Sequence, residues 1–174
     1  GWDWLVADRV PVPEWSFGFD SLTAYPDTGN PGSTTCDGSI GKLAITWTGA
    51  RDASPGGFID GAGTSILTAA SSLDTATYIV NRIATNFNTA ALGSGATISA
   101  ATYSLYCQSR TLNDSGVLNL VTNSWPNNSY SVYDFTNFGT TSQASSNPTV
   151  TASQYNDWSL NATGLGNISK TGVT

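Results

Sequence analysis

Short runs of alternating apolar and polar residues recur along the chain from residue 43 onwards, separated by turns rich in Gly, Pro, Asn and Ser. A period of two residues is typical of β-strands that bury one face. The runs follow one another at close to the spacing of about 8–12 residues found in sandwiches and barrels. The pattern predicts strands at residues 43–47, 64–68, 77–87, 97–109, 116–122, 129–135, 148–153 and 156–162.

No segment shows a convincing helical period with capping residues. Residues 67–76, LTAASSLDTA, come closest, but the segment is short and rich in Ser and Thr, so we interpret it as a loop. The fold class predicted from the periodicity is therefore all-β.

The predicted strand at 97–109, TISAATYSLYCQS, has a change of phase. Alternation places Tyr103, Leu105 and Cys107 on one face, which we expect to be the core face. Ile98 lies out of phase with that series, and one extra residue near Ala100–Ala101 would restore it. An extra residue of this kind is a β-bulge, which bends a strand.

Composition favours an extracellular protein. The 174 residues suffice for one domain, and only 10% of them are charged, less than half the usual share of about 25%. The six Lys and Arg residues are scattered and the net charge is −6, which excludes a nucleic-acid interface. No apolar run reaches the roughly 18 residues that a membrane span needs, so we expect no membrane insertion.

Candidate catalytic sets are missing from the sequence. The chain has no His, which excludes Ser-His-Asp and Cys-His catalysis and imidazole metal sites. Its carboxylates are eleven Asp and one Glu, and nothing in their spacing singles out the pair that a glycosidase needs. We therefore expect a protein that is not an enzyme and has no required cofactor.

Two cysteines, Cys36 and Cys107, leave two alternatives open: a disulfide, or two thiols that behave as small apolar residues. An oxidising compartment would favour the disulfide. It is also where the Asn-X-Ser/Thr sequons would be glycosylated, at Asn113, Asn127, Asn161 and Asn167.

Four aspartates stand in or near Gly-rich loops of the first third of the chain: Asp27, Asp37, Asp52 and Asp60. Oxygen ligands from loops suit Ca²⁺, so these residues are candidate calcium ligands. The favoured alternative is that each Asp caps a turn by accepting hydrogen bonds from its own backbone.

Five of the six Trp residues fall into two groups. Trp125 and Trp158 have Asn or Asp neighbours, as an exposed ring that stacks on a sugar would, although a sandwich core commonly buries its Trp. Trp2, Trp4 and Trp15 belong to an extended, Pro-containing arm over residues 1–17, where aromatic residues suit a protein interface. The domain organisation predicted is this arm followed by one β-domain over residues 18–174.

A family resemblance covers roughly residues 20–174. The run NRIATNFNTAALGSGATISAATYSLYCQS, over residues 81–109, resembles β-sandwich modules of secreted bacterial proteins and of appendages of environmental viruses. The matching pieces are Phe87-Asn88, Leu92-Gly93, Ala96 to Tyr106 and Ile168 to Thr174, with entry segments at residues 24–41 and 58–64. These modules are related to domains of the Asp-Asn-Arg-Leu-Arg-Glu type and to some carbohydrate-binding jelly rolls. Together with the strand spacing, the resemblance implies an antiparallel β-sandwich of jelly-roll type with an extended N-terminal arm.

Two departures from the family pattern bear on assembly. The family usually has Asp at the position of Asn88, which puts any role of that carboxylate in doubt. Similar modules also continue past the TGVT that ends this sequence at Thr174. Either the sequence is part of a longer chain, or a strand from another subunit completes the sandwich.

Two function hypotheses follow. The first is a structural or adhesive module of an extracellular or virion appendage, which forms a homo-oligomer or filament through the arm or an exchanged strand. The second is a carbohydrate-binding module that recognises cell-surface or environmental glycans through Trp125 or Trp158.

Overall fold

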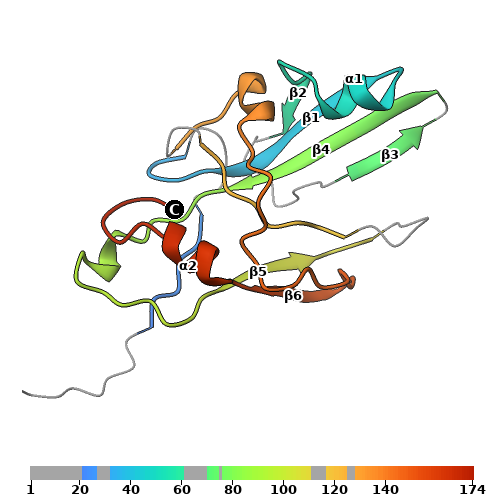
Figure 1. Cartoon of the computed structure of the whole chain (residues 1–174). Helices are drawn as coiled ribbons and strands as arrows, with labels where there is room; N and C mark the ends of the chain where they lie inside the picture. Colours follow the sequence, from blue (N-terminus) through green and yellow to red (C-terminus); the bar gives the residue numbers. More distant parts are fainter. Residues whose placement is uncertain (1–20, 27–31, 61–69, 75, 111–116, 125–127) are drawn as a thin grey trace, which may run out of the picture.

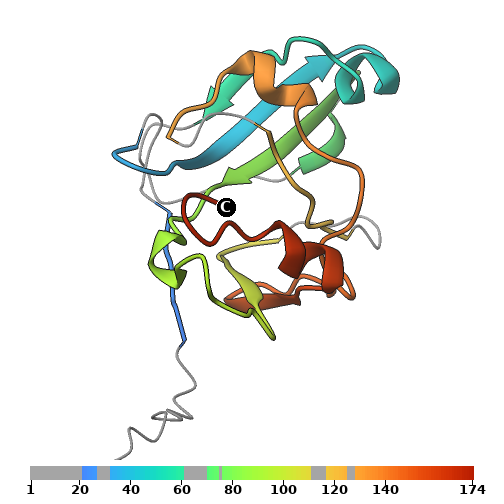
Figure 2. The same cartoon turned by 60° about the vertical axis from the view of Figure 1, so that its left-hand side comes forward.

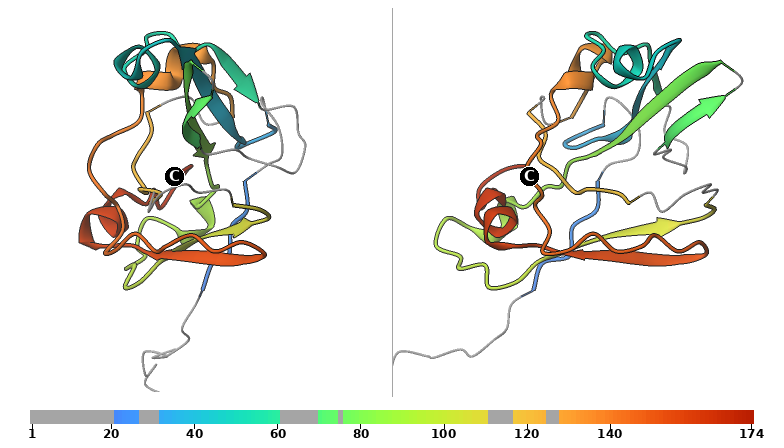
Figure 3. Two further views of the ribbon diagram at one scale, coloured as in Figure 1. Left: turned by 90° about the vertical axis from the view of Figure 1, so that its right-hand side faces the viewer. Right: turned by 45° about the vertical axis from the view of Figure 1, so that its right-hand side comes forward.

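The computed structural model describes residues 21–26, 32–60, 70–74, 76–110, 117–124 and 128–174. Its strands form two antiparallel sheets in separate layers (Figures 1 and 3). One sheet has the order β2-β1-β4-β3, from β1 (Asp37–Ala44), β2 (Phe58–Asp60), β3 (Ala70–Asp74) and β4 (Thr77–Thr85). The other pairs β5 (Thr102–Cys107) with β6 (Gln154–Ser159). The fold is therefore antiparallel and β-rich, with short helical elements.

The main core lies on one face of the four-stranded sheet. In the register of β1 and β4, Ile40 is opposite Arg82 and Lys42 is opposite Val80, so these residues share a face. That face packs against α1 (Trp47–Arg51) and the short 3₁₀ helix η2 (Val132–Thr136), as Figure 2 shows. The buried cluster comprises Cys36, Ile40, Ala50, Ala53, Val80, Ala84, Tyr130 and Phe135.

Helix capping replaces two of the predicted strands. The Thr46 side chain accepts a hydrogen bond from the Gly49 amide at 3.1 Å, which ends β1 and begins α1, so a strand through residue 47 is wrong. The expected strand at 129–135 is also wrong. There Ser131 and Asp134 form a capping box, and their reciprocal bonds begin η2.

The second layer is built around Trp158. Its ring contacts Tyr103 edge-on, with centroids 5.9 Å apart, and Tyr103 contacts Phe87 in the same way at 5.8 Å. The indole Nε1 donates to the Leu118 carbonyl at 3.2 Å, which holds the segment 117–124 against this layer. Neither the described part of the expected strand at 116–122 nor the expected strand at 148–153 forms a strand. Isolated bridges instead join Asn123 to Phe138 and Ala144 to Leu160.

The last residues of the sequence pair with the segment that follows β4. Phe87 and Thr174 exchange two backbone hydrogen bonds of 2.8 and 2.9 Å, and Asn88 bridges to Val173. The Thr89 hydroxyl lies within hydrogen-bond distance of the Ser169 and Gly172 carbonyls and of the Thr174 hydroxyl. These bonds bring the segments around Phe87 and Thr174, two of the pieces that carry the resemblance, together in space.

The remaining elements flank this pairing. The 3₁₀ helix η1 (Ala90–Leu92) follows Thr89, and α2 (Ala162–Asn167) follows β6. Residues 96–101 are not part of a strand, and β5 begins only at Thr102, so a bulged strand from 97 to 109 is wrong. The segment interpreted as a loop, 67–76, contains β3. No helix in the described ranges is both long enough and apolar enough to cross a bilayer.

Candidate functional site

The outer edge of β5, with which no described segment pairs, is the first candidate site. Ser159 on β6 is opposite Thr102 on β5, and its carbonyl accepts from the Ser145 amide at 2.9 Å, on the side away from β5. In an antiparallel pair, residues that bond away from the partner strand alternate with residues that bond to it. The backbone groups of Thr102, Ser104 and Tyr106 therefore point outward from β5, and no described segment pairs with them.

The composition of this edge suits strand addition. Natural edge strands are commonly protected by charged residues, Pro or bulges. The β5 sequence, TYSLYC, has no charged residue and no Pro, and it consists largely of residue types that favour strands. The edge is therefore a template for a further antiparallel strand.

The exposed face beside this edge carries cross-strand pairs. The rings of Tyr106 and Tyr155, which are 55% and 68% exposed, contact each other edge-on with centroids 5.3 Å apart. The Ser104 hydroxyl donates to an Asp157 carboxylate oxygen. Such pairs stabilise the two-stranded sheet while leaving its outer edge unpaired.

A polar pocket of about 320 Å³ is the second candidate site. It lies where the segment 122–124 meets the residues around the end of η2, which Asn123 and Phe138 join as a bridge. The lining residues are Thr122, Asn123, Ser124, Thr136, Asn137, Phe138 and Gly139. None of them is charged.

Hydrogen bonds fix the two amide side chains that line the pocket. Asn123 donates through Nδ2 to the Asn86 Oδ1 atom at 2.9 Å. Asn137 donates through Nδ2 to the Asp134 Oδ1 atom at 2.7 Å. Both amide groups are thus oriented before any ligand arrives, and neither of their Oδ1 atoms accepts a hydrogen bond from a described residue.

The half-buried guanidinium of Arg82 stabilises the core beside the pocket. It stacks on the Phe135 ring at 4.1 Å from the centroid, and donates to the carbonyls of Phe135 and Arg51. Burial lowers the pKa of Arg82, an effect that Asp52 opposes. Because two of its N–H groups donate to backbone carbonyls and its plane stacks on Phe135, Arg82 has a structural role.

The predicted tryptophan sites have different outcomes. Trp158 is 2% exposed and cannot present a ring face to a sugar, so that glycan candidate is wrong and the residue belongs to the core. Trp125 and the arm residues Trp2, Trp4 and Trp15 lie outside the described residues.

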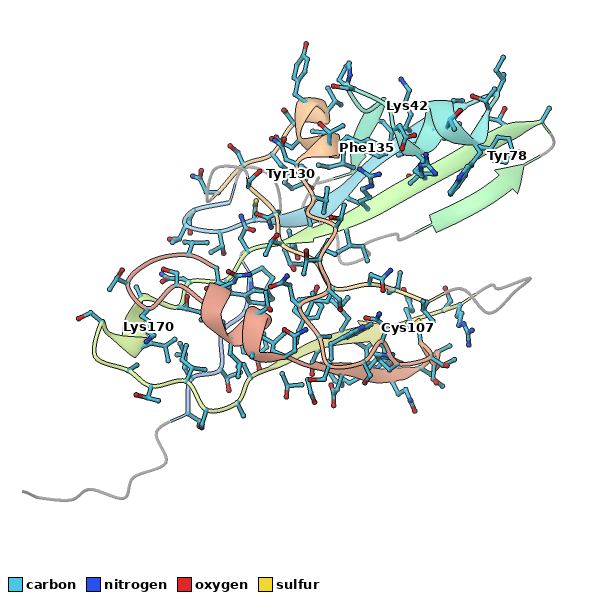
Figure 4. All side chains as sticks on the ribbon, in the orientation of Figure 1. Lys42, Tyr78, Cys107, Tyr130, Phe135 and Lys170 are labelled. Carbon is cyan, nitrogen blue, oxygen red and sulfur yellow. The ribbon has the colours of Figure 1, made fainter. Side chains whose placement is uncertain are left out.

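The two cysteines are not joined by a disulfide. Cys36 is fully buried in the main core, whereas Cys107 is half-buried near the end of β5, in the other layer (Figure 4). The Cys107 thiol donates to the Ser109 carbonyl at 3.2 Å. The alternation predicted for β5 is confirmed, since Tyr103, Leu105 and Cys107 are its more buried residues.

The calcium site predicted at four aspartates stays a prediction. Asp37 and Asp60 stand at strand ends, and no group of three metal-binding side chains occurs in the described part of the chain. Asp52 ends α1, and its hydrogen bond with Arg51 lowers its pKa. Asp27 lies outside the described residues.

In two of the predicted glycosylation sequons, the Asn side chain makes hydrogen bonds within the fold. The Asn161 side chain caps α2 by accepting from the Gly164 amide at 2.9 Å, and donates to the Ser142 and Ala144 carbonyls. Asn167 donates to the Gln143 side chain at 2.7 Å. Both amides therefore have structural roles that a glycan would disturb. Asn113 and Asn127 lie outside the described residues.

The sequence interpretation missed both candidate sites. For the β5 edge, the sequence offered a signal in the uncharged, strand-forming run 102–107, but it did not show which segments pair with that strand. For the pocket, the sequence offered a weaker signal: the two Asn-containing segments TNS and TNF at residues 122–124 and 136–138.

No protein-family model, curated protein or solved structure matches the chain.

Proposed function

We propose that this chain is a non-enzymatic structural and adhesive module of an extracellular or virion appendage, and that copies assemble by adding a strand to the open edge of β5. The observation that carries the proposal is the set of outward backbone groups at Thr102, Ser104 and Tyr106. A strand from a second copy would give each group a hydrogen-bond partner. The donor is either the arm over residues 1–17 or an exchanged strand.

The proposal includes the finer fold, a jelly-roll sandwich of the module family that the sequence resembles. Two observations support it. The segments around Leu120, Gln143 and Ser145 are hydrogen-bonded in succession to one another and to β6, which widens the second layer. The Tyr103 hydroxyl is hydrogen-bonded to Thr85 of β4, which links that layer to the four-stranded sheet.

The extracellular or virion location rests on composition. A surface that obtains its polarity from Ser, Thr and Asn, with only 10% charged residues, suits a secreted or virion-exposed module. A second candidate function, carbohydrate binding, is favoured by the uncharged pocket.

The decisive test compares two proline variants of the full chain by sedimentation velocity at rising concentration, with negative-stain microscopy. Thr102→Pro removes an outward amide at the first residue of β5, where an edge strand tolerates Pro. Ser99→Pro is the matched control, since Ser99 is exposed and outside any strand. We expect the wild type and Ser99→Pro to assemble, and Thr102→Pro to need at least tenfold higher concentration.

Two outcomes would contradict the proposal. One is a wild-type chain that stays monomeric at high concentration, and the other is a folded Thr102→Pro variant that assembles like the wild type. Deletion of residues 1–17 then distinguishes the two possible sources of the added strand. Assembly that survives the deletion must use a strand other than the arm.

A further inference from the structure

The polar pocket has the chemistry of a saccharide site. We infer that it binds a neutral saccharide, a hexose or N-acetylhexosamine unit of a glycan. This inference deepens the adhesive part of the proposed function, and it rests on the pocket rather than on the β5 edge.

The polar groups of the pocket match sugar hydroxyls. Two side-chain amides and three hydroxyls, from Thr122, Ser124 and Thr136, line a space of about 320 Å³. Vicinal sugar hydroxyls both donate and accept, so they need neutral partners that do the same, and Asn, Ser and Thr provide both functions. The volume falls at the small end of the roughly 300–1,000 Å³ typical of small-molecule sites.

The pocket is held in shape without a ligand. Gly139 donates its amide to the Thr122 carbonyl at 2.8 Å, and a Cβ at Gly139 would lie 2.6 Å from the Thr122 hydroxyl oxygen. A side chain at position 139 would therefore force the Thr122 side chain to shift. With both amides already oriented by Asn86 and Asp134, little side-chain order has to be gained on binding.

The uncharged lining of the pocket limits which small ligands it can bind. Phosphate or carboxylate groups would need a cation, yet no lining residue is charged, and the guanidinium of the nearby Arg82 is stacked on Phe135 and donates to two backbone carbonyls. A cationic ligand would lack a carboxylate partner, because no acidic residue lines the pocket. Phe138 adds an apolar surface for the C–H face of a sugar or an N-acetyl methyl group. A neutral saccharide satisfies all of these conditions.

The test is saturation-transfer NMR and calorimetry of the full chain with neutral hexose and N-acetylhexosamine oligosaccharides, and with sialylated ones for comparison. Thr136→Lys extends a long side chain from the pocket rim, while Thr140→Lys places the same exposed side chain on the next loop, outside the lining. We expect Thr136→Lys to weaken binding of a neutral saccharide at least tenfold and Thr140→Lys to leave it unchanged. The side-chain amide signals of Asn123 and Asn137 should shift on titration.

Several results would overturn the inference: no binding of neutral saccharides at millimolar concentration, binding of sialylated ones only, or binding that a folded Thr136→Lys variant retains. Retained binding would show that the saccharide binds outside this pocket, and Trp125 would be the next residue to change. Assembly through β5 is measured separately with Thr102→Pro, so either idea can fail alone.

Discussion

The hydroxyl of Tyr103 on β5 lies 3.0 Å from the Thr85 Oγ1 atom on β4, so a hydrogen bond joins the two sheets. Around it, the Tyr103 ring lies between Phe87 and Trp158. The same tyrosine therefore fixes the second layer to the first and supports the strand whose outer edge we propose as the assembly site.

Removing this hydroxyl should weaken the fold without disturbing the ring contacts. Tyr103→Phe leaves the half-buried Thr85 hydroxyl without its partner, and we expect a loss of about 0.5–1.5 kcal/mol in the free energy of unfolding. Tyr106→Phe is the matched control, because its hydroxyl is on the exposed face of the same strand, and should change stability by less than about 0.5 kcal/mol. Urea unfolding measures both. Equal losses would show that the link between the sheets contributes nothing.

Alkaline pH should destabilise the fold by ionising Tyr103. Burial raises the pKa of Tyr103 to about 12, above the ordinary value of 10 that applies in the unfolded chain. The neutral phenol is thus favoured by folding, and this contribution, up to about 3 kcal/mol, is complete below pH 10 and is lost as the pH rises towards 12. Unfolding curves between pH 9 and 12 should fall less steeply for Tyr103→Phe than for the wild type. Parallel curves would contradict the assignment.

Arg82 should not be replaceable by Lys. The planar guanidinium stacks on Phe135 and reaches two carbonyls, from Phe135 and Arg51, which an ammonium cannot match in this geometry. We expect Arg82→Lys to cost about 1.5–3 kcal/mol by urea unfolding. The control is Arg51→Lys, since the Arg51–Asp52 ion pair is exposed and solvent-screened, and its change should alter stability little. A loss as small for Arg82→Lys as for the control would exclude the stacking role.

Gly41 should be required for the pairing of β1 with β2. A Cβ there would lie 2.1 Å from the Phe58 ring and 2.2 Å from the Asn81 Oδ1 atom. We expect Gly41→Ala to cost at least about 1–3 kcal/mol, because the Phe58 ring must move off the strand. Gly95→Ala meets no atom within 4 Å, and should be neutral or stabilising by about 0.4–1 kcal/mol. Thermal melts of the two variants test this contrast, and equal melting temperatures would contradict it.

Local periodicity predicted some elements and not others, for physical reasons. The strand pattern identified β4, and alternation identified the more buried face of β5, whose residues alternate between exposed and half-buried. It missed β1, whose two Gly residues weaken the pattern, and it missed η2, where the Ser131–Asp134 capping box outweighs the alternation of SYSVYDF. Local side-chain hydrogen bonds of this kind compete directly with strand formation.

The candidate sites depended on contacts between distant segments. Whether β5 is an edge strand depends on which segments pair with its two sides. Its described partner, β6, lies more than 40 positions away in the sequence, and no local pattern encodes that pairing. Trp158 shows the same limit. Its Asn and Asp neighbours suggested an exposed ring, but the ring is buried by Tyr103 and bonded to Leu118. The pocket joins residues 122–124 with 136–139, a pairing that only the fold reveals.

The most direct test of assembly through β5 is amide hydrogen exchange, followed by NMR, in assembled and monomeric protein. The amides of Tyr103 and Leu105 bond to β6 and should be protected in both states, which makes them internal controls. The account predicts that the outward amides of Thr102, Ser104 and Tyr106 exchange rapidly in the monomer and become protected in the assembly. An assembly in which these three amides still exchange as rapidly as in the monomer would contradict strand addition at this edge.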